Sequence, residues 1–405
     1  MTATEARATG QPARPALLTV GFAALLGVTF LVYTQNFLIQ AVVPLLVVDL
    51  GGDAALVGIV VAIYSLPSML LRPFIGRFAD ERGLYPTWAT GTFLLAIVAA
   101  LYSIPSLIAV TLNRLLHGSA WAAFNTGGHA TMARSAPAER RGQATSVYNL
   151  VIAVSQLAVP GLGLVIATLY GFTTTFLLAA VIALAAFILI RLGPVPRPAP
   201  SPRATGEGAQ RQRLIERGAV LPMLFETLFT AAVPLYFSFL PLFALRHDIP
   251  IAEVAIFFPI YGTVFLIARS LFTPWSDRLG RRLLLAISVV FAIIGLAVGA
   301  VAQDLPTIIL SGCLFAIGPA LETPASMALA IDRSDPSRSG AAMATYSLGY
   351  QMGLGVGAAL FGFAIAAFDF GVAFGIAVAM QVLLALLLIV NWHNLPGGAR
   401  RSAAA

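Results

Sequence analysis

The sequence predicts an all-α membrane protein with about twelve transmembrane helices in two similar six-helix bundles. Of its 405 residues, 59% are hydrophobic and only 10% are charged, whereas a soluble domain carries roughly 25% charged residues. Because so few charges cannot cover a water-exposed surface, the apolar side chains must face lipid. Apolar stretches of about 20 residues, each long enough to cross a bilayer, recur from Leu17 to Trp392.

The apolar stretches define six predicted spans on each side of a polar segment. The spans cover residues 17–48, 55–78, 85–104, 106–133, 142–168 and 171–192, and then 219–245, 252–274, 283–302, 306–331, 340–366 and 371–392. The segment between them is rich in Pro and Arg without an apolar period, which is typical of a linker. We therefore predict a first bundle over residues 1–193, a cytoplasmic linker over 194–218 and a second bundle over 219–405.

The basic residues predict the orientation in the membrane. All 24 are Arg, and with a cytoplasmic N-terminus 20 of them fall in cytoplasmic segments. Arg72, Arg114 and Arg269 fall inside spans, and only Arg246 is left outside. This asymmetry predicts a multi-pass protein of the cell membrane with both termini in the cytoplasm. The positive net charge therefore reflects topology, and no nucleic-acid partner is expected.

The two halves carry an internal repeat. Arg, Asp and Gly recur at identical spacing at the end of the second span of each half, as Arg72, Asp80 and Gly83 and again as Arg269, Asp277 and Gly280. Duplicated six-helix halves around one pseudo-axis are the architecture that supports alternating access. We interpret the two arginines as gate or structural residues that reach the interface, not as substrate ligands.

Three motifs resemble one transporter family. The segment from Gly76 to Gly83, GRFADERG, resembles the loop signature of the major facilitator superfamily between its second and third helices. Arg114-Leu-Leu-His-Gly118 resembles the fourth-helix motif of the drug–proton antiporters of that superfamily. Pro160-Gly-Leu-Gly163 is similar to a fragment of their fifth-helix motif, although Val159 stands where that motif prefers Gly. The resemblance implies a monomeric carrier with a central cavity that opens alternately to each side, coupled to an ion gradient, usually of protons, and without ATP or another cofactor.

The resemblance also implies a charged gate at the cytoplasmic ends of the helices. In the second half it implies a cluster of Asp277, Arg281 and Asp332. In the first half Leu84 replaces the corresponding Arg, and Arg134 occupies the position that matches Asp332. We hypothesise that Arg134 is the positive partner of Asp80, because a nearby opposite charge keeps a carboxylate ionised. The predicted gate comprises Gly76, Asp80, Gly83, Arg134, Asp277, Gly280, Arg281 and Asp332.

Four ionisable residues inside the spans are predicted to serve proton coupling or substrate binding, because such residues are costly in a membrane. Glu226 and Glu322 are the first candidates, since desolvation can bring a carboxyl group to exchange protons near neutral pH. His117 titrates near neutrality without any shift, and Arg114 is suited to holding a carboxylate or an anionic substrate group. For each residue, a structural hydrogen bond between helices remains the alternative.

The predicted cavity lining has few charges and many rings. It comprises Asn36, Gln40, Asn125, Asn149, Gln156, Tyr236, Tyr261, Tyr346, Tyr350 and Gln351. This set favours a hydrophobic or weakly polar substrate. The four His residues are scattered without a metal-ligand spacing, so neither a metal site nor an enzyme is expected.

The sequence thus predicts a secondary active transporter whose partners are a small-molecule substrate, protons and the lipid bilayer. The leading interpretation is proton-coupled export of small hydrophobic or amphipathic compounds, of the multidrug efflux type. The alternatives are a proton symporter or uniporter that imports a small metabolite such as a sugar or organic acid, and a lipid or lysolipid transporter.

Overall fold

The computed structural model describes residues 18–197, 215–272, 280–335 and 338–395. This part of the chain is built from helices and contains no β-strand, which confirms the predicted fold class. Nine of its helical segments are long and apolar enough to cross a membrane. Within the described residues every predicted span is mainly helical, although two spans are joined in one helix and others are divided into shorter helices.

The helices of the first half are α2 (Val20–Asp49), α3 (Ala54–Leu70), α4 (Arg72–Arg82), α5 (Leu84–Leu101), α6 (Leu107–Ser135) and α7 (Arg141–Leu192). Those of the second half are α8 (Val220–Thr230), α9 (Val233–Phe237), α10 (Leu240–Arg246), α11 (Ile251–Val254), α12 (Phe257–Phe272), α14 (Arg281–Ala300), α15 (Leu305–Asp332), α16 (Ser339–Ala367) and α17 (Phe370–Val390).

Several predicted spans differ from the structure in continuity, and the second and eighth are each divided into two helices, α3 with α4 and α11 with α12. The fifth and sixth spans are joined as α7, which turns at Gly171 with a φ of 83°, a conformation that glycine adopts readily. The seventh span, predicted as one helix, is broken into α8, α9 and α10. Pro234 and Pro241 lie in the first turns of α9 and α10, because proline fits the start of a helix but interrupts its interior.

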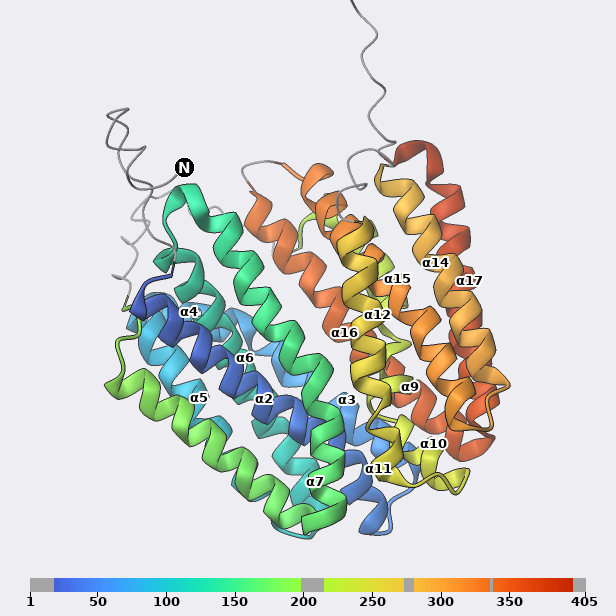
Figure 1. The fold of residues 1–405 in the computed structure, drawn as a ribbon. Coiled ribbons are helices and arrows are strands. Elements are labelled where there is room, and N and C mark those ends of the chain that lie inside the picture. Colours follow the sequence, from blue (N-terminus) through green and yellow to red (C-terminus); the bar gives the residue numbers. More distant parts are fainter. Residues whose placement is uncertain (1–17, 198–214, 273–279, 336–337, 396–405) are drawn as a thin grey trace, which may run out of the picture.

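The helices pack as two bundles whose axes are inclined to one another (Figure 1). In the first half α2 packs on α7, and α5 and α3 pack on α6. In the second half α14 packs on α15 and α17, while α16 packs on α8. Contacts between the halves are made chiefly by α3 with α16 and by α7 with α11 and α12.

The halves touch most closely at one end of the molecule, which we call the closed end. It carries the turns after α2 and α16, and it lies opposite the end where α2 begins and α17 ends, which we call the linker end (Figure 1). A Cβ at Gly58 would lie 2.4 Å from the carbonyl oxygen of Ala358, and one at Gly161 would lie 2.5 Å from that of Ala255. Such approaches between backbones require glycine, so these positions seal the closed end.

Both ends of the predicted linker are anchored on the bundles. The guanidinium of Arg197 lies 4.8 Å from the ring centroid of Tyr85 in the first half. Glu216 pairs with Arg338 at 2.6 Å, and its backbone N–H donates to Thr345 in the second half. Residues 198–214 lie outside the described residues.

Glycine also permits the close packing of α16 on α8. A Cβ at Gly357 would lie 2.0 Å from the carbonyl oxygen of Ala231. We expect Gly357→Ala to cost about 1–3 kcal/mol of stability, seen as a lower midpoint of thermal unfolding by tryptophan fluorescence. Gly375→Ala is the matched control, because nothing lies within 4 Å of a Cβ there. Equal midpoints for the two variants would contradict the packing role.

Candidate functional site

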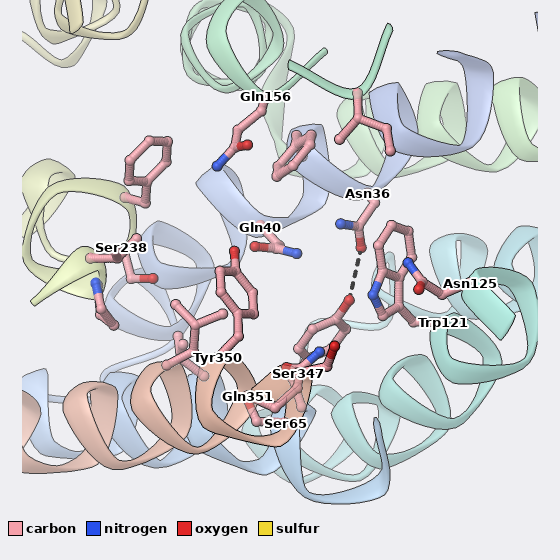
Figure 2. A pocket seen from close by; sticks show the side chains of 18 of the residues that line it. Asn36, Gln40, Ser65, Trp121, Asn125, Gln156, Ser238, Ser347, Tyr350 and Gln351 are labelled. Carbon is pink, nitrogen blue, oxygen red and sulfur yellow. Dashed lines mark hydrogen bonds between the residues drawn. The ribbon is translucent and has the colours of Figure 1, made fainter. Parts of the chain in front are cut away.

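A cavity of about 320 Å³ lies between the two halves, on the linker side of the closed end. Helices of the first half supply one wall, and α8, α9, α15 and α16 supply the other. Figure 2 shows Asn36, Gln40 and Gln156 facing Tyr350 and Gln351 across it. The lining also includes Tyr33, Phe37, Ser65, Trp121, Asn125, Phe237, Ser238, Thr323, Tyr346 and Ser347.

The wall from the first half is a set of amides and aromatic rings joined by hydrogen bonds. Tyr64 donates its hydroxyl to Oδ1 of Asn36 at 3.2 Å, and Asn125 donates Nδ2–H to the Tyr33 hydroxyl at 3.1 Å. The Trp121 ring meets Tyr33 edge to face at a centroid distance of 4.9 Å. Amides offer both donors and acceptors, and ring faces attract apolar groups and cations.

The wall from the second half contains a buried pair of carboxyl groups. Glu226 of α8 lines the cavity, and the Tyr346 hydroxyl donates to its Oε2 at 2.5 Å. Glu322 of α15 is also buried, and it lies close enough to Glu226 for the two carboxyl groups to interact electrostatically. Ser326 donates to Oε1 of Glu322 at 2.5 Å. Within the described residues, no Arg or His forms an ion pair with either carboxyl group.

Arg114 and His117 lie together in the first half, behind the cavity wall. The Arg114 guanidinium lies 5.5 Å from the ring centroid of Tyr64 and 5.7 Å from that of Tyr102. His117 Nδ1 lies 3.2 Å from the Tyr102 hydroxyl. Both residues are buried, and neither lines the cavity. The structure therefore separates this pair from the Glu226 and Glu322 pair.

The structure brings seven of the predicted lining residues to the cavity: Asn36, Gln40, Asn125, Gln156, Tyr346, Tyr350 and Gln351. It places the other three elsewhere. Asn149 lines a separate cleft of about 550 Å³ between α7 and α12, together with Arg269. Tyr236 bonds Ser311 at 2.7 Å, and Tyr261 stacks with Phe257 at 5.7 Å, so both belong to the aromatic core of the second half.

Several lining residues were not among those predicted. Tyr33 and Phe37 share a face of α2 with Asn36 and Gln40, because the four residues have the spacing of neighbouring helical turns. Their place in the lining could therefore have been predicted from the positions of Asn36 and Gln40 in the sequence. Arg72, interpreted from the sequence as a gate or structural residue, also lines the cavity.

The predicted gate residues lie at the linker end. Arg281 and Asp332 form an ion pair, whereas Asp277 lies outside the described residues. Arg134 is exposed on α6, and the side chain of Asp80 also lies outside the description, so their pairing stays a prediction.

The gate glycines show the internal repeat in the backbone. Gly83, between α4 and α5, has φ 99° and ψ 158°, while Gly280, at the start of α14, has φ 77° and ψ 156°. Both values require a residue without a side chain. Gly76 lies within α4 with no atom within 4 Å of a Cβ added there. Among the described residues, no group of His, Cys, Asp or Glu could hold a metal ion.

Two helical bundles that enclose one central cavity define the class of polytopic transporters built from repeated halves. The family model described as Major Facilitator Superfamily matches residues 25–273 and 236–404. The chain belongs to the Major Facilitator Superfamily, and it is a multi-pass membrane transporter.

Individual relatives agree with this assignment. An uncharacterized MFS-type transporter of Burkholderia pseudomallei (strain 1106a) is 27% identical over 98% of this chain and 99% of its own length. One of Burkholderia mallei (strain SAVP1) has the same identity and coverage.

Solved structures share the fold. The nucleoside transporter NupG has a TM-score of 0.72 and 13% identity, over 92% of this chain and 99% of its own. A POT family transporter in complex with 5-aminolevulinic acid has a TM-score of 0.76 and 14% identity, over 92% and 96%. An inward-facing bacterial homolog of the human lysosomal transporter Spinster has a TM-score of 0.74 and 14% identity, over 92% and 96%.

Proposed function

We propose that this transporter exports small amphipathic compounds from the cytoplasm in exchange for protons, by alternating access, as a monomer with both termini in the cytoplasm. In this proposal the bundles over residues 1–193 and 219–405 rock about the central cavity, joined by the linker over 194–218. The observation that carries it is Glu226, a carboxyl group that lines the cavity and lies close to a second buried carboxyl group, that of Glu322.

The carboxyl pair supports a proton-exchange role. Two carboxylates that lie close together repel each other, and burial away from water disfavours the charged form further. No cation among the described residues compensates them. Such a pair titrates as one unit and retains a proton until an external positive charge arrives. A proton and a cationic substrate group would therefore compete for Glu226, and this competition is the basis of exchange.

The cavity wall supports an amphipathic substrate. Seven aromatic side chains and five amides surround a volume suited to a small organic molecule, since rings cover apolar bodies while a few polar groups fix orientation. The contact of the halves at the closed end leaves the cavity on the linker side. The arginine distribution assigns that side to the cytoplasm, where an export substrate is loaded.

The test uses purified protein in liposomes that contain a pH-sensitive dye. A proton gradient is imposed, and a panel of lipophilic cations, sugars and lysolipids is added in turn. Proton movement that depends on a lipophilic cation is the expected result. Proton movement with a sugar would favour the symport alternative. Transport that ignores the gradient would overturn proton coupling and leave facilitated diffusion.

A further inference from the structure

We infer that the preferred substrate is a zwitterion, whose cationic group contacts Glu226 and whose anionic group contacts Arg72. This inference rests on the proposed function, because it names the substrate class of the same cavity. It revises the interpretation of Arg72 as a gate or structural residue and that of the substrate as merely hydrophobic or weakly polar.

The cavity carries one basic and one acidic side chain on opposite walls. Of the residues that line it, Arg72 and Glu226 alone are an Arg and a carboxylic acid, and the lining contains no His, Lys or Asp. Arg72 begins α4 in the first half, and Glu226 lies on α8 in the second. A substrate that bridges them therefore bridges the two bodies that move in alternating access.

Neither charge has a protein counter-ion among the described residues. No ion pair or hydrogen bond joins Arg72 to another described residue, and its electrostatic neighbours are the hydroxyls of Tyr33 and Tyr64 and the imidazole of His129. Among the described residues, the carboxyl group of Glu226 accepts a hydrogen bond from Tyr346 and lies close to the carboxyl group of Glu322. A charge held at membrane depth without a partner is costly. A partner supplied by the substrate removes this cost.

A zwitterion satisfies both groups at once. A simple cation would neutralise Glu226 but leave Arg72 uncompensated as the halves close, and a simple anion would do the reverse. The aromatic rings between the two walls fit an apolar body that carries the two charged groups at its ends. The substrate class is therefore an aromatic or aliphatic amine that also carries a carboxylate or another anionic group.

The internal repeat supplies a matched control. Arg269 is the repeat equivalent of Arg72, yet it lines the cleft between α7 and α12 and not the cavity. Substitution of Arg269 therefore removes an equivalent charge at an equivalent helix position without altering the cavity wall.

The experiment measures binding to the purified transporter by titration calorimetry. The probes are 4-(aminomethyl)benzoic acid and the longer 4′-(aminomethyl)biphenyl-4-carboxylic acid, each with its methyl ester and its N-acetyl derivative. The ester keeps only the positive charge, and the N-acetyl compound keeps only the negative one. We expect at least one of the zwitterions to bind about tenfold or more tightly than both of its derivatives, as one added charge-assisted contact implies.

The variants assign the two contacts. In Arg72→Gln the ratio of zwitterion to ester affinity is expected to fall to about one, whereas Arg72→Lys is expected to retain part of it. In Arg269→Gln the ratio is expected to stay at the wild-type value. In Glu226→Gln the ratio of zwitterion to N-acetyl affinity is expected to fall to about one.

The wild-type comparison decides the inference even where a variant does not fold. Esters that bind as tightly as their zwitterions, or zwitterions that do not bind at all, would overturn it. The proposed function fails separately, when neither a zwitterion nor a lipophilic cation drives proton movement in liposomes. Proton-coupled export of the ester, with no preference for the zwitterion, would therefore support the proposed function but contradict the inference that the substrate is a zwitterion.

Discussion

Glu226→Gln is expected to reduce gradient-driven substrate accumulation in liposomes to the level of protein-free vesicles. Glutamine has nearly the same shape and can still accept the hydrogen bond of Tyr346, so the fold should be retained. It cannot ionise, however, and the proton and the substrate would no longer compete at this position. The measurement is the uptake of a labelled substrate with and without an imposed pH difference.

Glu253→Gln is the matched control, because Glu253 is exposed in α11 near the closed end and should leave accumulation at the wild-type level. Counterflow of labelled against unlabelled substrate separates coupling from binding, since it requires no proton movement. Accumulation by Glu226→Gln that follows the pH difference as in the wild type would exclude Glu226 as the coupling group.

Gly58→Leu is expected to shift the transporter away from the state with a sealed closed end. A Cβ at this position already lies 2.4 Å from the carbonyl oxygen of Ala358 and 2.9 Å from Cα of Gly362, so a leucine side chain must push α3 and α16 apart. Interfaces of this kind have discrete arrangements and do not deform continuously. Spin labels at Ile104 and Phe368, both exposed near the closed end, should report a longer distance between the halves, and transport should fall.

The matched control for Gly58→Leu is Gly375→Leu on α17, where nothing lies within 4 Å of a Cβ. Labels are attached in a Cys313→Ser background, since Cys313 is the single cysteine of the chain. An unchanged label distance in Gly58→Leu would show that the contact between α3 and α16 does not hold the halves together.

The helical architecture could be predicted from the sequence because a helix that spans a bilayer needs a stretch of apolar residues of defined length. The sequence also made Glu226 and Glu322 candidates, since an acid inside a span is rare and costly. It could not show which acid faces the cavity. Helices surrounded by lipid and by other apolar helices lack the polar stripe that reveals orientation in a soluble protein.

The missing information on helix orientation also explains why the sequence could not distinguish tyrosines that line the cavity from tyrosines in the core. Tyr236 and Tyr346 are the same residue type on spans that border the cavity, yet one is held by Ser311 in the core and the other donates to Glu226. Their rotation about the helix axis depends on packing between helices, which has no local sequence signature. The break of the seventh span, by contrast, was visible in principle, because Pro234 and Pro241 interrupt the helical ladder.

The most direct test of the account is the number of protons released when a substrate binds. The purified transporter is titrated with a lipophilic cation or a zwitterion in weakly buffered detergent solution, with a pH-sensitive dye, over a range of pH. The account predicts proton release upon binding, weaker binding as the pH falls because Glu226 becomes protonated, and the loss of both effects in Glu226→Gln. Binding that releases no proton and has the same affinity at every pH would contradict the competition on which the proposed exchange depends.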